Sequence, residues 1–185
     1  MRTDAYKASR YENGKIAIDG HSIELVGNTG RVFNGLVTGY PGTGKTMFLE
    51  TLGMAALASG SWKVLYTYGV DGARPGFSNT PVRWGSGTEA AWQHLAAAKN
   101  HIEWSSAENA TAGLRGLIPS PARQSLLWII DELDRLCAVD PAFGAELTRI
   151  THAGGRNGMA VWASAMRASG GNFLSFVPSS NVVAL

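Results

Sequence analysis

The chain has 185 residues, a formal net charge of +2, 45% hydrophobic residues and only 16% charged residues. At roughly 150 residues per domain this length predicts one globular domain, and the low charged fraction argues against disorder and against a coiled coil. The single cysteine, Cys137, excludes an intrachain disulfide framework and fits a reducing compartment. No apolar run approaches the ~18 residues that span a bilayer and no secretory leader is visible, so we expect a cytoplasmic protein.

Residues 1–14 are polar, and we expect them to form a loose arm ahead of a single domain over residues 15–185. Around Asp19 and Gly20, a strong turn signal, apolar residues alternate with polar ones, which predicts a β-hairpin over residues 15–26. Further along, short apolar runs typical of buried strands alternate with segments of helical periodicity. The predicted strands cover residues 35–38, 62–68, 82–84, 125–130, 159–164 and 181–185, and the predicted helices cover 45–59, 88–101 and 132–152, with an interruption at Asp140 and Pro141. Residues 105–124 are ambiguous, with a short helix and a loop as the interpretation.

This alternation of strands and helices predicts an α/β fold. Its sheet should be mainly parallel, with helices on both faces and right-handed crossovers, and the N-terminal hairpin should precede it.

The strand over residues 35–38 leads into a glycine-rich segment, Gly39-Tyr40-Pro41-Gly42-Thr43-Gly44-Lys45-Thr46, which fits the pattern G-x-x-x-x-G-K-[ST] at every fixed position. Glycines let the backbone curl so that successive N–H groups point at phosphate oxygens, and the helix that follows presents its free N–H groups to the same anion. Lys45 should reach the β- and γ-phosphates, and the Thr46 hydroxyl should ligate Mg²⁺. The predicted nucleotide-binding residues are Gly39, Pro41, Gly42, Thr43, Gly44, Lys45, Thr46 and Met47.

A second acidic site follows the apolar run that ends at Ile130. Asp131 should emerge at the C-terminal edge of the sheet, where ligands of open α/β folds bind, and hold Mg²⁺ together with Thr46. Glu132 is placed to orient or deprotonate an attacking water. Taken alone, the two acids could equally mark a helix N-terminus, where carboxylates are favoured. The nearby P-loop pattern favours a RecA-like P-loop NTPase, and the lack of an N-K-x-D run favours ATP over GTP.

Beyond these two motifs, the order of segments resembles the motor core of the FtsK/SpoIIIE DNA translocases, within the FtsK–HerA group. The resemblance is ordered along roughly residues 15–185 and is moderately specific only in its last block. The segments that carry it are the hairpin with Ile18-Asp19-Gly20-His21, the loop Gly69-Val70-Asp71-Gly72-Ala73, the helix start Trp84-Gly85-Ser86-Gly87-Thr88-Glu89, the block from Gly154 to Ser169 and the strand region from Phe173 to Leu185.

The resemblance implies a ring, usually a hexamer, that threads double-stranded DNA while ATP is hydrolysed at subunit interfaces. Arg156 falls on the position of an arginine that reaches into the neighbouring subunit's site, where a guanidinium neutralises charge on the transferred phosphoryl group. Met166 stands where the family has a sensor glutamine, and its thioether cannot replace an amide, so sensing could move to Ser164. The resemblance implies a further core helix beyond Leu185, so we expect this sequence to be either a minimal version or a truncated part of such a core.

Two other functions stay open from the sequence. The low basic charge and Met166 favour an ATP-binding module that assembles or regulates partners without translocation, and the short length suits a viral genome-packaging ATPase. A small-molecule kinase would need a lid with several arginines, whereas residues 105–124 offer only Arg115 and Arg123, which could instead touch nucleic-acid phosphates.

The tryptophans in predicted strands are expected to lie in the core, namely Trp62, Trp128 and Trp162. We expect Trp92 and Trp104, on a predicted helix, to pack as well.

Overall fold

Six parallel strands form the central sheet of the computed structural model, which describes residues 10–72, 76, 82–166 and 181–185. The spatial order is β6-β5-β7-β8-β4-β9, and every neighbouring pair is parallel. The strands are β4 (Gly35–Thr38), β5 (Trp62–Tyr68), β6 (Arg83–Ser86), β7 (Ser125–Asp131), β8 (Met159–Ala165) and β9 (Val182–Ala184). This is the predicted α/β arrangement of a RecA-like P-loop fold, with strand positions close to those expected.

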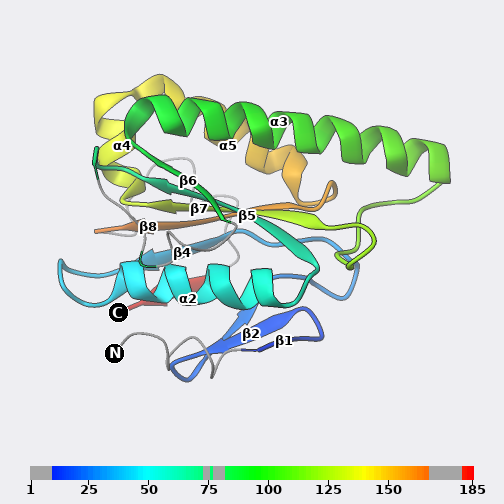
Figure 1. Ribbon diagram of the computed structural model, residues 1–185, viewed down its shortest axis with the longest axis horizontal. Coiled ribbons are helices and arrows are strands. Elements are labelled where there is room, and N and C mark those ends of the chain that lie inside the picture. The colour runs from blue at the N-terminus through cyan, green and yellow to red at the C-terminus, as the bar shows by residue number, and fades with distance from the viewer. Residues whose placement is uncertain (1–9, 73–75, 77–81, 167–180) are drawn as a thin grey trace.

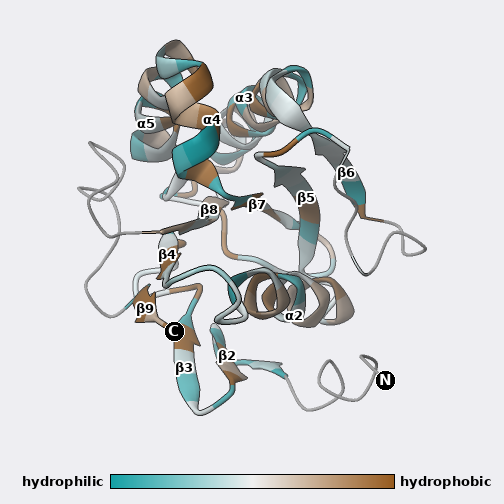
Figure 2. Ribbon diagram, turned by 90° about the vertical axis from the view of Figure 1, so that its left-hand side faces the viewer, coloured by the Kyte–Doolittle hydropathy of each residue, from teal (hydrophilic) through white to brown (hydrophobic). Residues whose placement is uncertain are grey.

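Helices cover both faces of the sheet (Figure 1). Helix α2 (Lys45–Ala58) packs on one face, and α3 (Gly87–Ala112), α4 (Leu133–Val139) and α5 (Pro141–Gly154) pack on the other. Figure 2 shows this layering with α2 and the small N-terminal sheet on one side and α3, α4 and α5 on the other. The interruption predicted at Asp140 is confirmed, because its side chain caps α5 by accepting bonds from the N–H groups of Ala142 and Phe143.

A small antiparallel sheet lies beside α2 and contains the predicted hairpin. Its strands are β1 (Tyr11–Glu12), β2 (Lys15–Ile18) and β3 (His21–Glu24). The sequence does not predict β1, because residues 1–14 carry no strand pattern. Tyr11 is held there by an edge-on contact with the buried Trp62, at a ring separation of 6.2 Å.

The core confirms the prediction for Trp62, Trp128 and Trp162, which are all fully buried. β7 and β8 are buried along their whole length, which explains their continuous apolar sequences. No helix among residues 10–72, 76, 82–166 and 181–185 is long and apolar enough to cross a membrane.

Helix α3 is longer than predicted and takes in residues 105–112 of the segment 105–124 that the sequence left ambiguous. Its 26 residues correspond to about 39 Å, whereas a seven-residue strand spans about 23 Å. The C-terminal end of α3 therefore extends past the sheet (Figure 1). Residues 103–112 lack an apolar stripe because most of them face solvent, and the helix ends only at Gly113, which adopts a left-handed φ of 65°.

Candidate nucleotide site

The P-loop connects β4 to α2 at the C-terminal edge of the sheet. Gly42 and Gly44 adopt φ values of 86° and 99°, which side chains with a Cβ rarely take, so the glycines of the motif are required by the path of the loop. Gly44 caps α2 without a side-chain hydrogen bond, and the first turn of α2 contains no acid. The backbone N–H groups of that turn are therefore available to an anion, which fits a phosphate-binding loop.

The Lys45 ammonium lies across this loop. Its Nζ donates to the carbonyl oxygens of Gly39 at 2.7 Å and Tyr40 at 3.0 Å. A cation is thus held by two carbonyl oxygens of the loop next to the N-terminus of α2, where it adds to the positive end of the helix. Met47, predicted with the nucleotide-binding set, lies in the first turn and is 45% exposed.

Asp131 is the last residue of β7 and is 2% exposed. The Thr46 hydroxyl donates to its Oδ2 at 2.7 Å, and the Ser164 hydroxyl donates to its Oδ1. The two residues predicted as metal ligands are therefore in direct contact although 85 positions separate them. A hydroxyl and a carboxylate are hard oxygen donors of the kind that Mg²⁺ prefers, so this pair fits the cation.

Ser164 was not assigned to the metal site from the sequence, although it was considered as a substitute sensor. Besides donating to Asp131, its Oγ accepts a bond of 2.8 Å from the backbone N–H of Glu132. Ser164 therefore holds both the Asp131 carboxylate and the backbone of the residue that follows it. The parallel pairing of β7 with β8 brings Asp131 and Ser164 together, and no local sequence pattern predicts this contact.

Glu132 follows the strand in a left-handed conformation, with φ 57° and ψ 48°. Such a conformation costs a non-glycine residue about 1–3 kcal/mol and tends to occur at functional sites. Its carboxylate is partly exposed, and Oε2 lies 3.4 Å from Nε of Arg135, a pairing that solvent weakens. The carboxylate is thus accessible to water at the C-terminal edge of the sheet, as a general base requires.

A buried acid beside this edge is missed by the sequence reasoning. Glu50, in α2, is 3% exposed, and its Oε1 accepts bonds from the Tyr68 hydroxyl at 3.0 Å and the Gly76 N–H at 2.7 Å. Burial, followed by the Glu50 charge, raises the pKa of Tyr68 well above its usual value. The only available signal was a glutamate within the apolar run of a predicted helix.

Met166 cannot hydrogen-bond through its side chain, which is 47% exposed. Its backbone N–H instead donates to Oδ2 of Asp134 at 3.1 Å. The end of β8 is therefore linked to α4 through the main chain. The hydrogen-bonding role expected of a sensor side chain at this position has no counterpart in Met166.

Arg156 lies at the opposite edge of the sheet, just before β8. With Arg31 and Arg115 it lines a hollow of about 570 Å³ that contains no acidic residue. Backbone bonds hold the three arginine-bearing segments together, from Val32 N–H to Gly155 O at 2.9 Å and from Leu117 N–H to Arg156 O at 3.0 Å. The structure therefore brings the P-loop and the acids together but places Arg156 at the other end of a seven-residue strand, about 23 Å long.

Arg123, the other cation considered for nucleic-acid phosphates, is already paired. Its guanidinium lies 2.9 Å from Oδ1 of Asn109 and 3.5 Å from Oε2 of Glu108. Contact with nucleic-acid phosphates therefore does not suit Arg123, whereas Arg115 stays a candidate for it.

No family model matches the chain, and no curated protein matches it. Several solved structures share its fold. The ATPase 2 and 3 region of EssC from Geobacillus thermodenitrificans aligns over 77% of this chain and 30% of its own, with a TM-score of 0.63 and 15% identity. The cytoplasmic domain of the type VII secretion ATPase EccC from Thermomonospora curvata aligns over 84% of this chain and 21% of its own, with a TM-score of 0.66 and 14% identity.

The pCW3 conjugation coupling protein TcpA, in a monomer form with ATPγS, aligns over 92% of this chain and 56% of its own, with a TM-score of 0.62 and 16% identity. In each case the chain spans less than two thirds of its neighbour's length. At these identities the comparisons show that this chain has the fold of a P-loop ATPase.

Proposed function

We propose that this chain is a Mg²⁺-dependent ATPase that works as a homo-oligomeric ring, of the hexameric kind, and uses ATP hydrolysis to move double-stranded DNA. The observation that carries the proposal is the contact between Thr46, next to the phosphate-binding loop, and Asp131, at the end of the neighbouring strand. A phosphate cradle and a hard-oxygen pair at one sheet edge are the components that nucleoside triphosphate hydrolysis requires.

Different residues of the site bind the phosphates and the Mg²⁺ ion in this proposal. The N–H groups of the P-loop and the first turn of α2 receive phosphate oxygens, and Lys45 moves from its carbonyl partners to the β- and γ-phosphates. Thr46 and Asp131 would hold a Mg²⁺ ion, which would supply neutralising charge for the phosphates. Ser164 keeps the Asp131 carboxylate in place and remains its ligand-orienting partner.

Hydrolysis then needs a base and a stabilising cation. The Glu132 carboxylate takes a proton from the attacking water, in keeping with its partly exposed position at the same edge. Arg156 cannot serve the site of its own chain from the other edge, so it acts on the site of the next copy in the ring. Double-stranded DNA as the substrate rests on the resemblance to FtsK/SpoIIIE translocases, and TcpA, whose name is that of a conjugation coupling protein, agrees with it.

The test is the ATPase rate with and without linear duplex DNA. We expect DNA to stimulate the rate several-fold, and Glu132→Gln to lower it by about 100-fold or more while nucleotide binding persists. Glu103→Gln, at an exposed position of α3, is the matched control and should behave as wild type. A low rate that neither DNA nor Glu132→Gln changes would contradict the proposal and favour a nucleotide-binding module without translocation.

A further inference from the structure

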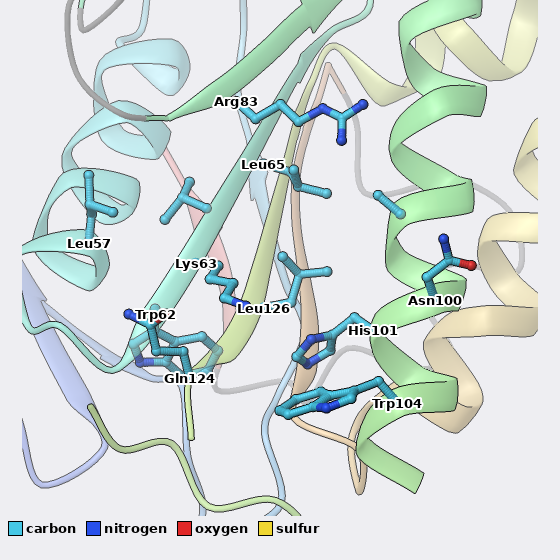
Figure 3. A pocket seen from close by; sticks show the side chains of 12 residues that line it. Leu57, Trp62, Lys63, Leu65, Arg83, Asn100, His101, Trp104, Gln124 and Leu126 are labelled. Atoms are coloured by element: carbon cyan, nitrogen blue, oxygen red, sulfur yellow. The ribbon is translucent and has the colours of Figure 1, made fainter. Parts of the chain in front are cut away.

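A cleft of about 560 Å³ lies between α3 and the part of the sheet where β5 and β7 begin (Figure 3). Its volume is within the range of about 300–1,000 Å³ that is usual for pockets holding small ligands. Because the P-loop lies where the strands end, this cleft is separate from the candidate nucleotide site.

The floor of the cleft belongs to the sheet. Leu65 of β5 and Leu126 of β7 line it and pack in the apolar layer under α3. Alternate residues of a strand share a face, so Lys63 lies on the same face as Leu65. The parallel register pairs Leu65 with Arg83, which places Arg83 on this face too. At ordinary strand spacings the Cα atoms of Lys63 and Arg83 are about 8 Å apart, so one anion can contact both side chains.

The cleft carries uncompensated positive charge. Lys63 and Arg83 are both exposed, and among the described residues neither is paired with a carboxylate. The residues that line the cleft include no acid. Burial lowers the pKa of His101, another lining residue, so its ring is uncharged at neutral pH and the charge comes from the two long side chains. The cleft therefore favours a ligand with a negative group.

Trp104 departs from the expectation that it packs in the core. It is 41% exposed, and its ring lies 5.5 Å from that of His101 on the α3 wall of the cleft. The Lys63 ammonium lies 6.0 Å from the centre of the indole, at the outer limit of a cation–π contact, so the ring is not held by a close partner there. An exposed indole beside cations offers a flat apolar surface on which an aromatic group can stack.

Two carboxamides complete the lining. Asn100 of α3 makes no hydrogen bond through its side chain among the described residues, and Gln124 donates from its nitrogen to the Gly60 carbonyl at 2.8 Å, which leaves its oxygen as an acceptor. A carboxamide both donates and accepts hydrogen bonds. Such groups match the edges of nucleobases, which also carry both donors and acceptors.

We propose that this cleft binds an unpaired nucleotide, with its base stacked on Trp104 and its phosphate between Lys63 and Arg83. Stacking tolerates any base, because every base has a π-face. An acidic peptide would use the two cations but would leave the indole without an aromatic partner. Duplex DNA does not supply this ligand either, because its base faces are covered by their neighbours. The nucleotide is either a free mononucleotide or part of a single strand.

The probe for a strand is 5′-fluorescein-labelled octathymidylate, with binding to the full chain followed by fluorescence anisotropy. We expect Trp104→Leu and Lys63→Glu each to weaken binding by about tenfold or more, because the first removes stacking and the second reverses a charge that faces the phosphate. Both side chains are exposed, so the urea unfolding midpoint should stay unchanged. Lys15→Glu, at an exposed lysine of β2, is the matched control and should keep wild-type affinity.

Tryptophan emission distinguishes the two sources of the nucleotide. Unlabelled octathymidylate should quench it in the wild type but not in Trp104→Leu, and the same quench by thymidine monophosphate alone would identify a free nucleotide as the ligand. The proposal would be overturned if neither probe binds, if the Trp104→Leu variant binds as the wild type does, or if an octa-aspartate peptide or a blunt duplex competes as well as the single strand. Lys45→Ala should leave the quench unchanged, so the outcome is independent of whether the P-loop binds ATP.

Discussion

At the C-terminal edge of the sheet, Thr46, Asp131 and Ser164 are bonded to one another, whereas at the N-terminal edge Arg31, Arg115 and Arg156 bond to no side chain among the described residues. The hydrogen bonds of this acidic edge, formed by Thr46, Asp131 and Ser164, are all made within one chain. The arginine edge gathers three cations around a hollow and gives them no anion. Converging like charges disfavour one another unless an anion compensates them.

The difference is what the proposed ring requires, because its arginine edge would have to meet another copy of the chain. About 23 Å of sheet separates the two edges, so the arginines cannot reach the P-loop of their own chain. In a ring assembled head to tail, the arginine edge of one copy meets the acidic and phosphate-binding edge of the next. The two edges are then complementary halves of one intermolecular site.

The largest predicted effect on the ATPase rate comes from substitutions that disable the arginine edge in one chain and the P-loop in another. Arg156→Ala should lower the ATPase rate by about 1000-fold, as loss of an arginine that stabilises phosphoryl transfer does. A mixture of Arg156→Ala and Lys45→Ala chains should regain activity at about a quarter of the interfaces, if mixing is random. Steady-state phosphate release on the separate and mixed proteins measures both.

Arg149→Ala controls for the loss of an exposed arginine, because Arg149 pairs with Glu146 on α5 and belongs to neither edge. It should keep the wild-type rate. If Arg156→Ala were fully active, or if the mixture stayed as inactive as its components, the two edges would not form a shared site.

The second prediction concerns the buried sheet that joins the two edges, since loss of activity there would reflect unfolding. His94 contacts Thr67 through Nδ1 at 2.7 Å, and the Thr67 hydroxyl also accepts from Nε1 of Trp128 at 2.8 Å. Burial, followed by the charge of Arg83, lowers the pKa of His94 to about 4. Between about pH 6.5 and 4 the unfolded chain binds the proton and the folded chain does not, so the free energy of unfolding should fall by about 3 kcal/mol on acidification.

Urea unfolding at a series of pH values measures this loss. His94→Gln keeps a hydrogen-bonding side chain but cannot titrate, so this variant should lose that part of the pH dependence. His152→Gln, at an exposed position of α5, should retain it. An unchanged pH dependence in His94→Gln would show that another group is responsible.

What the sequence predicted correctly is mostly local. The P-loop, the strand that ends at Asp131 and the helix interruption at Asp140 and Pro141 depend on short spacings, and all three lie where they were expected. The link from Ser164 to Asp131 depends on β7 and β8 lying side by side, which is a property of the whole sheet. The partner of Glu50 likewise comes from a different element, Tyr68 at the end of β5.

Exposure was harder to predict than strand position. A large aromatic side chain such as that of Trp104 is expected to be buried, but α3 extends past the sheet and Trp104 lies on its exposed part. The convergence of Arg31 with Arg115 and Arg156 was not predicted either, because three separate loops meet there through backbone hydrogen bonds. Such features follow from the lengths of elements relative to one another, which periodicity alone does not give.

The third prediction concerns the hydrogen bonds by which Ser164 holds Asp131 at the acidic edge. Ser164→Ala removes the donor to Asp131 Oδ1 and the acceptor for the Glu132 N–H, and loss of such an orienting partner typically costs about 10–100-fold in metal affinity or activity. Titration of the ATPase rate with Mg²⁺ should show the defect as a higher Mg²⁺ requirement.

Ser125→Ala is the matched control, since Ser125 is equally buried but begins β7 at the other edge, where its hydroxyl has no partner among the described residues. It should leave the Mg²⁺ requirement unchanged. If the two serine variants behaved alike, the position of Ser164 beside Asp131 would have no special role.

The smallest effect is expected from Arg115, which shares the hollow with Arg156 but is not the arginine placed on the reacting phosphate. Arg115→Ala should lower the ATPase rate by about fivefold, because an exposed charge contributes to association more than to the chemical step, and the defect should shrink at high salt. Arg123→Ala removes a nearby arginine already paired with Glu108 and Asn109, so it should have no such salt-dependent effect. A loss for Arg115→Ala as large as that for Arg156→Ala, and independent of salt, would place Arg115 in the chemistry and make the arginine edge a two-residue catalytic element.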